Sequence, residues 1–271
     1  MVRVEEFVLS RDLSRATVEC HYRYKLGMLA SYLGKRQVSL ELLERYPGWL
    51  RSRGLADASI QTTIAAAKAY LRWAVEHGYA PEECMRWKPR LRIPEQAPKA
   101  IEGQDAEKMI AAARNARDRA LLILLRDTGA RISSLLSINI EDIDFASKRI
   151  LTKQKGGRLI SLYLSPRAFT AVWELAKGRS NGPLFVGRNG RLGMGGVRYI
   201  LKRCAKRAGV KGRYNAHAWR HAFAKRCIIA GLDISQTSRL MGHRSIAVTA
   251  RYYAVWDSAE LAKAHAQVVN S

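Results

Sequence analysis

Acidic residues are scarce in this chain of 271 residues. It holds 23 Asp and Glu residues against 47 Lys and Arg residues, which gives a formal net charge of +24. From Leu175 through Leu232 there is no Asp or Glu at all. Because protein surfaces ordinarily mix both signs, this imbalance predicts a polyanionic partner, with nucleic acid the first choice. An anionic membrane surface is disfavoured, since the basic residues are spread over many predicted helices rather than one amphipathic anchor.

Long apolar runs and paired cysteines are also lacking. No apolar stretch approaches the roughly 20 residues that a membrane span needs, and charges interrupt the N-terminal segment, unlike a secretion signal. The four cysteines are widely spaced, without a C-x-x-C pair, which predicts buried, reduced thiols rather than disulfides or metal ligands. We therefore expect a cytoplasmic protein with no membrane segment. The cysteines are Cys20, Cys84, Cys204 and Cys227.

Apolar residues recur at helical spacing in the first ninety residues. The pattern predicts helices over 14–33 and 58–79, with a shorter helical stretch between them that Pro47 breaks. Gly34 and Gly78 stand where the two longer helices should end. The polar faces of these helices carry Arg, Lys, Gln and Thr, which either contact DNA phosphates or are simply solvated. Three or four such helices make a small all-α unit.

A proline-containing segment separates this unit from the rest. Pro89, Pro94 and Pro98 stand among charged residues, and no apolar periodicity crosses them. This composition is typical of an extended linker. The expected organisation is an N-terminal helical domain over 1–90, a linker over 91–103 and a C-terminal domain over 104–271.

The C-terminal part is predicted to be mainly helical with one β-hairpin. Residues 149–154 and 159–164 alternate in polarity around Gly156-Gly157, a pair that tight hairpin turns favour, and no other β signal is clear. A last amphipathic helix over 257–268 either caps its own domain or docks on a neighbouring copy. The predicted fold class is α+β, mainly α with a small β-sheet, in two domains that would clamp around DNA.

Cationic side chains in this part suit a phosphate. His217 and Arg220 are three residues apart and share a face if the segment is helical. Arg131 follows the Gly129 turn and begins the next predicted helix, where backbone N–H groups already attract anions. Tyr252 supplies a phenol that such cations can activate by lowering its pKa. The combination indicates phosphoryl transfer on a nucleic acid backbone.

The ordered set closely resembles the tyrosine recombinase (phage integrase) family. The resemblance rests on TGARISSLLSINIEDID, HAWRHAFA and MGHRSIAVTARYY, spans the whole chain, and includes a histidine nine residues before the tyrosine. It implies an N-terminal core DNA-binding domain, a linker and a catalytic domain, with no metal or other cofactor. The implied catalytic residues are Arg131, Lys153, His217, Arg220, His243 and the nucleophile Tyr252.

The resemblance also implies a role for each residue. Tyr252 forms a 3′-phosphotyrosyl link, and the two arginines stabilise the pentacoordinate phosphate. His217 assists proton transfer, Lys153 is the general acid for the 5′-oxygen, and His243 hydrogen-bonds the phosphate. A homo-tetramer would act on two DNA duplexes.

Some alternatives remain beside this reading. Tyr253 adjoins Tyr252 but does not keep the family's distance from His243, and Lys155 competes with Lys153 on the hairpin. The family's acidic residue soon after the first arginine is replaced by Ser134. The biological role is either Xer-like dimer resolution or integration and excision of a mobile element. Relaxation of DNA like a type IB topoisomerase, or DNA binding by an inactive protein, are the competing functions.

Overall fold

The structure, a computed structural model, consists of two compact units. It describes residues 2–11, 17–91, 99–153, 159–242, 245–246, 249–250 and 265–266, with the backbone alone at Cys20 and Lys153. The units are Met1–Glu95 and Gln96–Ser271. Among the residues described, no helix has the length and apolar character that a membrane crossing requires.

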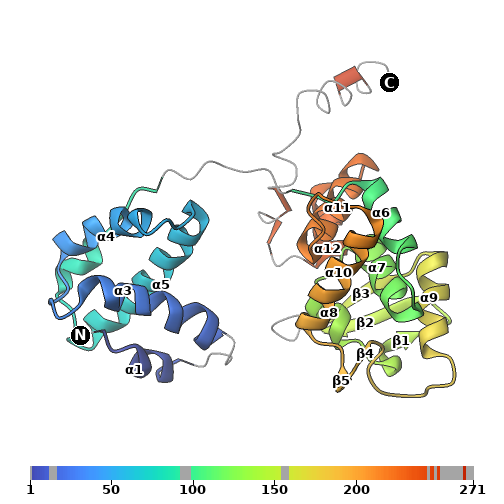
Figure 1. The fold of residues 1–271 in the computed structure, drawn as a ribbon, viewed down its shortest axis with the longest axis horizontal. Helices are drawn as coiled ribbons and strands as arrows, with labels where there is room; N and C mark the ends of the chain where they lie inside the picture. Colours follow the sequence, from blue (N-terminus) through green and yellow to red (C-terminus); the bar gives the residue numbers. More distant parts are fainter. Residues whose placement is uncertain are drawn as a thin grey trace. The chain divides into compact units, whose positions relative to one another are not determined.

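All regular elements in residues 2–11 and 17–91 of the N-terminal unit are helical (Figure 1). Helix α5 packs against α1, α3 and α4. Their apolar faces, which include Phe7, Leu26, Leu43 and Ile60, form one buried core. The elements are α1 (Val4–Leu9), the π-helix η1 (Val18–Arg23), α3 (Tyr24–Leu33), α4 (Leu40–Ser52), α5 (Asp57–Glu76) and the 3₁₀-helix η2 (Glu82–Arg86).

Two predictions for this unit need correction. Helix α4 continues through Pro47, so the predicted break was wrong. Burial of Leu43, Tyr46 and Leu50 on one face of α4 offsets the hydrogen bond that proline cannot donate. The helix predicted over 14–33 is π-helical over Val18–Arg23 before α3 begins, and its first residues lie outside the described ranges. Its end at Gly34, with φ of 58°, is confirmed.

In its described residues the second unit is also mostly helical, with two small antiparallel sheets, which confirms the α+β fold class. Strands β1, β2 and β3 form one sheet in that order, and β4 pairs with β5. The elements are α6 (Gly103–Ala111), α7 (Ala116–Thr128), α8 (Ile132–Ser137), η3 (Ile140–Asp142), β1 (Ile143–Asp144), β2 (Arg149–Lys153), β3 (Leu159–Tyr163), α9 (Pro166–Ala176), β4 (Val186–Gly187), β5 (Gly190–Arg191), α10 (Met194–Ala208), α11 (Ala216–Ile229) and α12 (Ile234–Met241).

Helix α7 is the centre of this unit. Leu121, Leu122, Leu124 and Leu125 are fully buried, because α7 packs against α6, α9 and α11 around its circumference (Figure 1). The side chain of Asn115 accepts a hydrogen bond from the backbone of the first turn and so fixes where the helix begins. Of the elements in the site described below, α8 and α11 contact α7 directly.

The β-hairpin is confirmed in the strands that the structure describes. Ile150 pairs with Leu162 and Thr152 with Ile160, and these four residues form the buried face of the sheet. The short strands β1, β4 and β5 were not predicted, because two residues are too few for any alternation to be recognisable.

Predictions for the cysteines and for the C-terminal helix can be compared with the structure only where these residues are described. Cys84, Cys204 and Cys227 are free and buried, as expected of reduced thiols. Of the helix predicted over 257–268, only His265 and Ala266 are described, and both are helical. The rest of that prediction lies outside the described residues.

Candidate active site

A left-handed glycine turn places Arg131. Gly129 ends α7 with φ of +57°, a conformation that glycine adopts without strain. A Cβ atom at this position would lie 2.3 Å from the ring of Phe223 on α11, so the two helices could not pack as closely with any other residue. The chain then turns at once into α8, whose N-cap is the half-buried Arg131. The helix start predicted at Arg131 is confirmed.

Helix α11 carries both His217 and Arg220. The side chain of Asn215 accepts a hydrogen bond from the backbone N–H of Ala218 at 2.9 Å and caps the helix just before His217. The predicted helical spacing is therefore confirmed. The histidine is exposed in the first turn, whereas Arg220 is one turn further in and only 5% exposed.

The two arginines converge on the end of α12. Arg220 Nη1 donates to the Gly129 carbonyl at 2.6 Å, and Nη2 donates to the Met241 carbonyl at 2.7 Å. Arg131 Nη1 donates to the carbonyl of Gly242, the next residue, at 2.8 Å. Backbone carbonyls that accept hydrogen bonds from a guanidinium group fix its orientation. Two such groups on neighbouring carbonyls form a fixed cationic site that suits a phosphate.

Lys153 is tied to this site through its strand. It is the last residue of β2 and pairs with Leu159 of β3. The preceding residue, Thr152, is buried and donates from Oγ1 to the Ser134 carbonyl in α8 at 3.1 Å. This bond links the strand that carries Lys153 to the helix that Arg131 starts. The Lys153 side chain lies outside the described residues, as do Lys155 and Arg158.

The remaining predicted site residues follow α12 along the chain. Asp233 and Gln236 form a capping box that begins α12, and Gly242 ends it in the left-handed conformation with φ of 61°. His243 comes directly after this glycine, but it lies outside the described residues. So do Tyr252 and Tyr253. These residues stay predictions.

Comparison with known proteins identifies the family. A profile described as Phage integrase family matches residues 99–258, which is more than half of the chain. This chain belongs to the phage integrase family. A second profile, Phage integrase, N-terminal SAM-like domain, matches residues 4–78. Members of this family are the tyrosine recombinases, and the chain is therefore a site-specific DNA recombinase of the tyrosine type.

Similar proteins support this assignment. The chain is 28% identical over 266 residues to a protein named tyrosine recombinase XerC from Roseiflexus sp. (strain RS-1), covering 89% of this chain and 84% of that protein. A Tn1549 transposon integrase has a similar fold, with a TM-score of 0.79 at 16% identity over 97% of both chains. A lambda integrase dimer gives a TM-score of 0.74 at 18% identity, over 94% of this chain and 96% of that one.

The structure adds His221 to the vicinity of the site. Its ring stacks on that of His217, with 6.4 Å between centroids. Burial, followed by the charges of His217 and Arg220, lowers the pKa of His221 to about 4, so it is neutral at physiological pH. The sequence did contain a signal for this residue, because it lies four positions after His217, one turn along the same helix.

The depressed pKa of His221 predicts a pH-dependent stability. The unfolded recombinase binds a proton at this imidazole below pH ~6.5, whereas the folded one does so only near pH 4. The contribution of neutral His221 to stability is therefore complete above pH ~6.5 and is lost as pH falls toward 4. The denaturant concentration at the unfolding midpoint should fall between pH 7.5 and pH 4.5, and this fall should be smaller for His221→Gln than for wild type. An equal drop in both proteins would contradict the prediction.

The basic residues of the acid-free stretch divide into two groups. Arg198, Lys202 and Lys206 are exposed at four-residue intervals on α10 and can contact a polyanion. Arg191 instead donates to the carbonyls of Leu136 and Ile138, and Arg203 pairs with the buried Asp118. Arg191 and Arg203 belong to the basic stretch that indicated DNA binding, but they make contacts within the fold of the second unit.

Proposed function

We propose that this recombinase cleaves and rejoins DNA strands through a covalent 3′-phosphotyrosyl intermediate. The observation that carries the proposal is the convergence of Arg131 and Arg220 on the carbonyls of Met241 and Gly242. The family's nucleophile, Tyr252, follows this turn in the sequence. A pair of fixed guanidinium groups stabilises the charge that develops on the non-bridging oxygens of a pentacoordinate phosphate. The pair requires no reorganisation to do so, because hydrogen bonds to backbone carbonyls at the ends of α7 and α12 already hold both guanidinium groups in place.

The proposed chemistry proceeds by one displacement. The phenolic oxygen of Tyr252 bonds to phosphorus, and the bond from phosphorus to the 5′-oxygen breaks. Lys153 donates a proton to that leaving oxygen, while His217 assists removal of the phenolic proton. His243 hydrogen-bonds the phosphate. The reverse displacement by a 5′-hydroxyl of another strand then restores the phosphodiester, so the step needs no cofactor.

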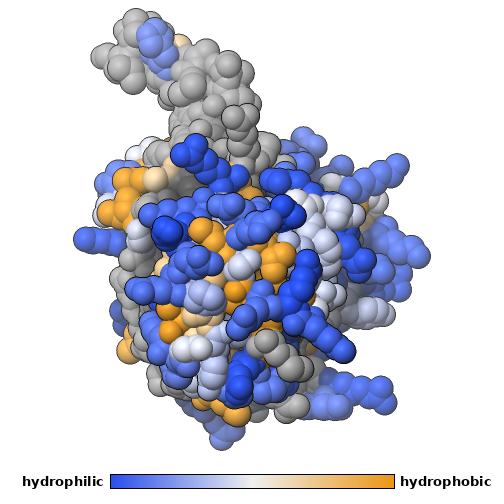
Figure 2. All heavy atoms as spheres, turned by 90° about the vertical axis from the view of Figure 1, so that its left-hand side faces the viewer, coloured by the Kyte–Doolittle hydropathy of each residue, from blue (hydrophilic) through white to orange (hydrophobic). Residues whose placement is uncertain are grey.

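The two parts of the chain have separate roles in this proposal. Residues 1–90 form a helical core DNA-binding domain, 91–103 a linker and 104–271 the catalytic domain. Gln61, Lys68 and Arg72 are exposed along α5 at spacings that place them on one side of the helix. On the side of the molecule that Figure 2 presents, hydrophilic residues predominate with small apolar groups between them. Such surfaces contact phosphates and position DNA without reading its sequence.

We further propose that a homo-tetramer acts on two recombination sites in the cytoplasm. A Tn1549 transposon integrase is described in complex with a circular intermediate DNA, and a lambda integrase tetramer is described as bound to a Holliday junction. Both have the fold of this chain, with TM-scores of 0.79 and 0.73. The biological role is either Xer-like dimer resolution or the integration and excision of a mobile element.

A site-selection experiment tests the function. The recombinase is incubated with a library of randomised duplexes that carry a nick, so that cleavage releases a short fragment and leaves the covalent adduct trapped. Sequencing the trapped DNA gives the target, and two copies are then placed on one supercoiled plasmid. Exchange between the copies supports recombination. Relaxation without exchange favours the topoisomerase-like alternative, and DNA binding without any adduct favours an inactive protein.

Lys153→Ala separates leaving-group protonation from the other steps. We expect normal DNA binding and cleavage slowed roughly 100-fold or more, the usual range for loss of a general acid. A 5′-bridging phosphorothiolate has a leaving group that needs no proton, so it should restore the rate. Lys155→Ala is the matched control and should cleave both substrates at close to the wild-type rate. If Lys155→Ala rather than Lys153→Ala cleaves ordinary DNA slowly and regains its rate on the phosphorothiolate substrate, the general acid is Lys155 and not Lys153.

A further inference from the structure

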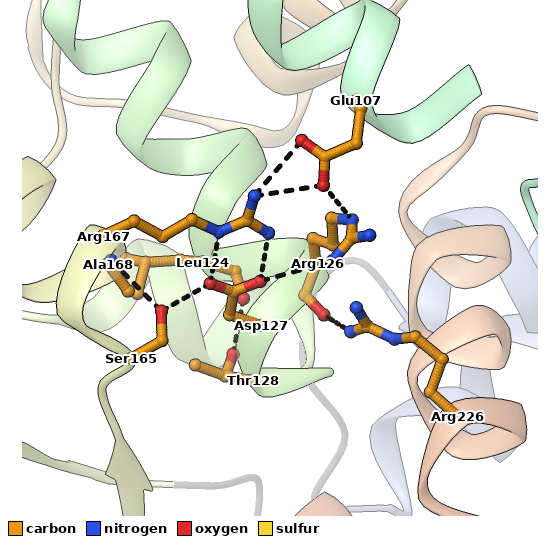
Figure 3. Close-up of polar contacts among 9 residues, drawn as sticks. All are labelled: Glu107, Leu124, Arg126, Asp127, Thr128, Ser165, Arg167, Ala168 and Arg226. Carbon is orange, nitrogen blue, oxygen red and sulfur yellow. Dashed lines mark hydrogen bonds and ion pairs between the residues drawn. The ribbon is translucent and has the colours of Figure 1, made fainter. Parts of the chain in front are cut away.

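A partly buried charge cluster surrounds the last turn of α7, just before the arginine site (Figure 3). It joins α6, α7, α9 and α11 of the catalytic unit, and Asp127 lies at its centre. Three guanidinium groups and two carboxylates take part. They are Arg126 and Asp127 of α7, Glu107 of α6, Arg167 of α9 and Arg226 of α11.

Asp127 is held from the side of α9. Its side chain is 9% exposed and accepts hydrogen bonds from Arg167 Nε at 2.8 Å, Arg167 Nη2 at 2.5 Å and Ser165 Oγ at 2.6 Å. Burial alone raises the pKa of Asp127, but these bonds and the charges of Arg167 and Arg126 outweigh it and keep the pKa below its usual value. The carboxylate is therefore ionised and oriented by a bidentate arginine.

This position is unfavourable for a carboxylate unless it is compensated. The C-terminal end of a helix carries partial negative charge, which repels an acidic side chain in the last turn. Asp127 occupies that turn of α7. Arg167 and Arg126 offset the repulsion and fix the carboxylate in one place at the same time. The arrangement holds the end of α7 rigidly against α9.

The same turn is held from the other side by α11. Arg226 donates to the carbonyl of Arg126 (Figure 3). Arg226 is half-buried, and burial followed by the charge of Arg126 lowers its pKa. Two turns earlier on α11, Arg220 donates to the carbonyl of Gly129, which is two residues after Asp127. The last turn of α7 thus connects the charge cluster directly to both arginines of the site.

We propose that Asp127 is a positioning residue for the arginine pair. Its bonds to α9 set the last turn of α7, and that turn sets both the Gly129 carbonyl that orients Arg220 and the direction in which Arg131 enters α8. Asp127 does not contact DNA. A displacement of about 1 Å at a reacting centre can cost about 100-fold in rate, so a small shift of this turn is enough to slow cleavage. The inference rests on the proposed function of the arginine pair.

Asp118 provides a matched control on the same helix. Its carboxylate is fully buried in the first turn of α7 and pairs with Arg117 at 2.8 Å and with Arg203, far along the helix from Gly129. Asp127→Asn and Asp118→Asn each remove one charge from a carboxylate with arginine partners while keeping its shape. Both should lower the melting temperature, but only the first should disturb the arginine pair.

The test measures single-turnover cleavage of the selected site at saturating DNA, at a temperature where each variant is folded. We expect DNA affinity within about twofold of wild type for both variants. Asp127→Asn should cleave about tenfold more slowly or worse, and a phosphorothiolate substrate should not restore its rate, since the leaving group is unaffected. Asp118→Asn should cleave within about twofold of wild type.

Each other outcome has a distinct meaning. Equal cleavage by Asp127→Asn and wild type, or equal slowing by Asp118→Asn, overturns the positioning role. If Asp127→Asn does not fold, Arg167→Gln removes the bidentate partner from the opposite side and decides by the same criteria. Absence of cleavage by wild type on every substrate refutes the proposed function itself.

Discussion

Arg220→Ala is expected to reduce DNA cleavage roughly 1,000-fold or more. Loss of a single preorganised donor to a developing oxyanion typically costs about 100- to 1,000-fold, and Arg220 offers a full charge rather than a dipole. Arg220 is also only 5% exposed, and its guanidinium group joins the Gly129 and Met241 carbonyls. Removing it therefore loosens the site as well as weakening phosphate binding. Single-turnover cleavage of the selected DNA measures the effect.

Two controls separate these contributions. Arg220→Lys keeps the charge but cannot bridge both carbonyls with a planar fork, so its rate should lie between those of Arg220→Ala and wild type. Arg191→Ala removes an arginine that likewise binds two carbonyls, those of Leu136 and Ile138 at the C-terminal end of α8. It should lose stability but retain cleavage. Equal loss of cleavage in Arg191→Ala and Arg220→Ala would show that the effect of Arg220 is structural.

Local features of the site could be predicted from the sequence. The spacing of His217 and Arg220 fits one face of a helix, and α11 has that face. Gly129 before Arg131 indicates a helix end followed by a helix start, and α7 and α8 meet there. Such features depend on residues close in the chain, where capping and helical period determine the outcome. Pro47 failed as a signal because buried neighbours in α4 outweighed a local preference.

Contacts between distant segments could not be predicted in this way. Arg131 and Gly242 are 111 residues apart, and Asp127 and Arg167 are 40 apart, with no periodic pattern connecting either pair. The basic residues were also indistinguishable in the sequence. Only the structure separates the exposed Arg198 from Arg203, which pairs with a buried carboxylate inside the unit. Composition indicates that the partner is negatively charged, but it does not indicate which Lys and Arg side chains are exposed to that partner.

Tyr252→Phe is expected to abolish covalent attachment to DNA altogether. Phenylalanine keeps the ring but lacks the oxygen that must bond to phosphorus, so no intermediate can form. Tyr252 stands nine residues after His243, the spacing that characterises the family, whereas Tyr253 stands ten after it. Tyr253→Phe is therefore a close control, with the same atom removed one position away.

Covalent trapping tests the account most directly. Wild type, Tyr252→Phe and Tyr253→Phe are each incubated with nicked or 5′-bridging phosphorothiolate DNA, and protein–DNA adducts are separated on a denaturing gel. The account predicts an adduct with wild type and Tyr253→Phe and none with Tyr252→Phe, although all three bind the DNA. An adduct that persists in Tyr252→Phe and disappears in Tyr253→Phe would contradict the assigned nucleophile. Absence of an adduct with all three proteins would contradict the proposed chemistry.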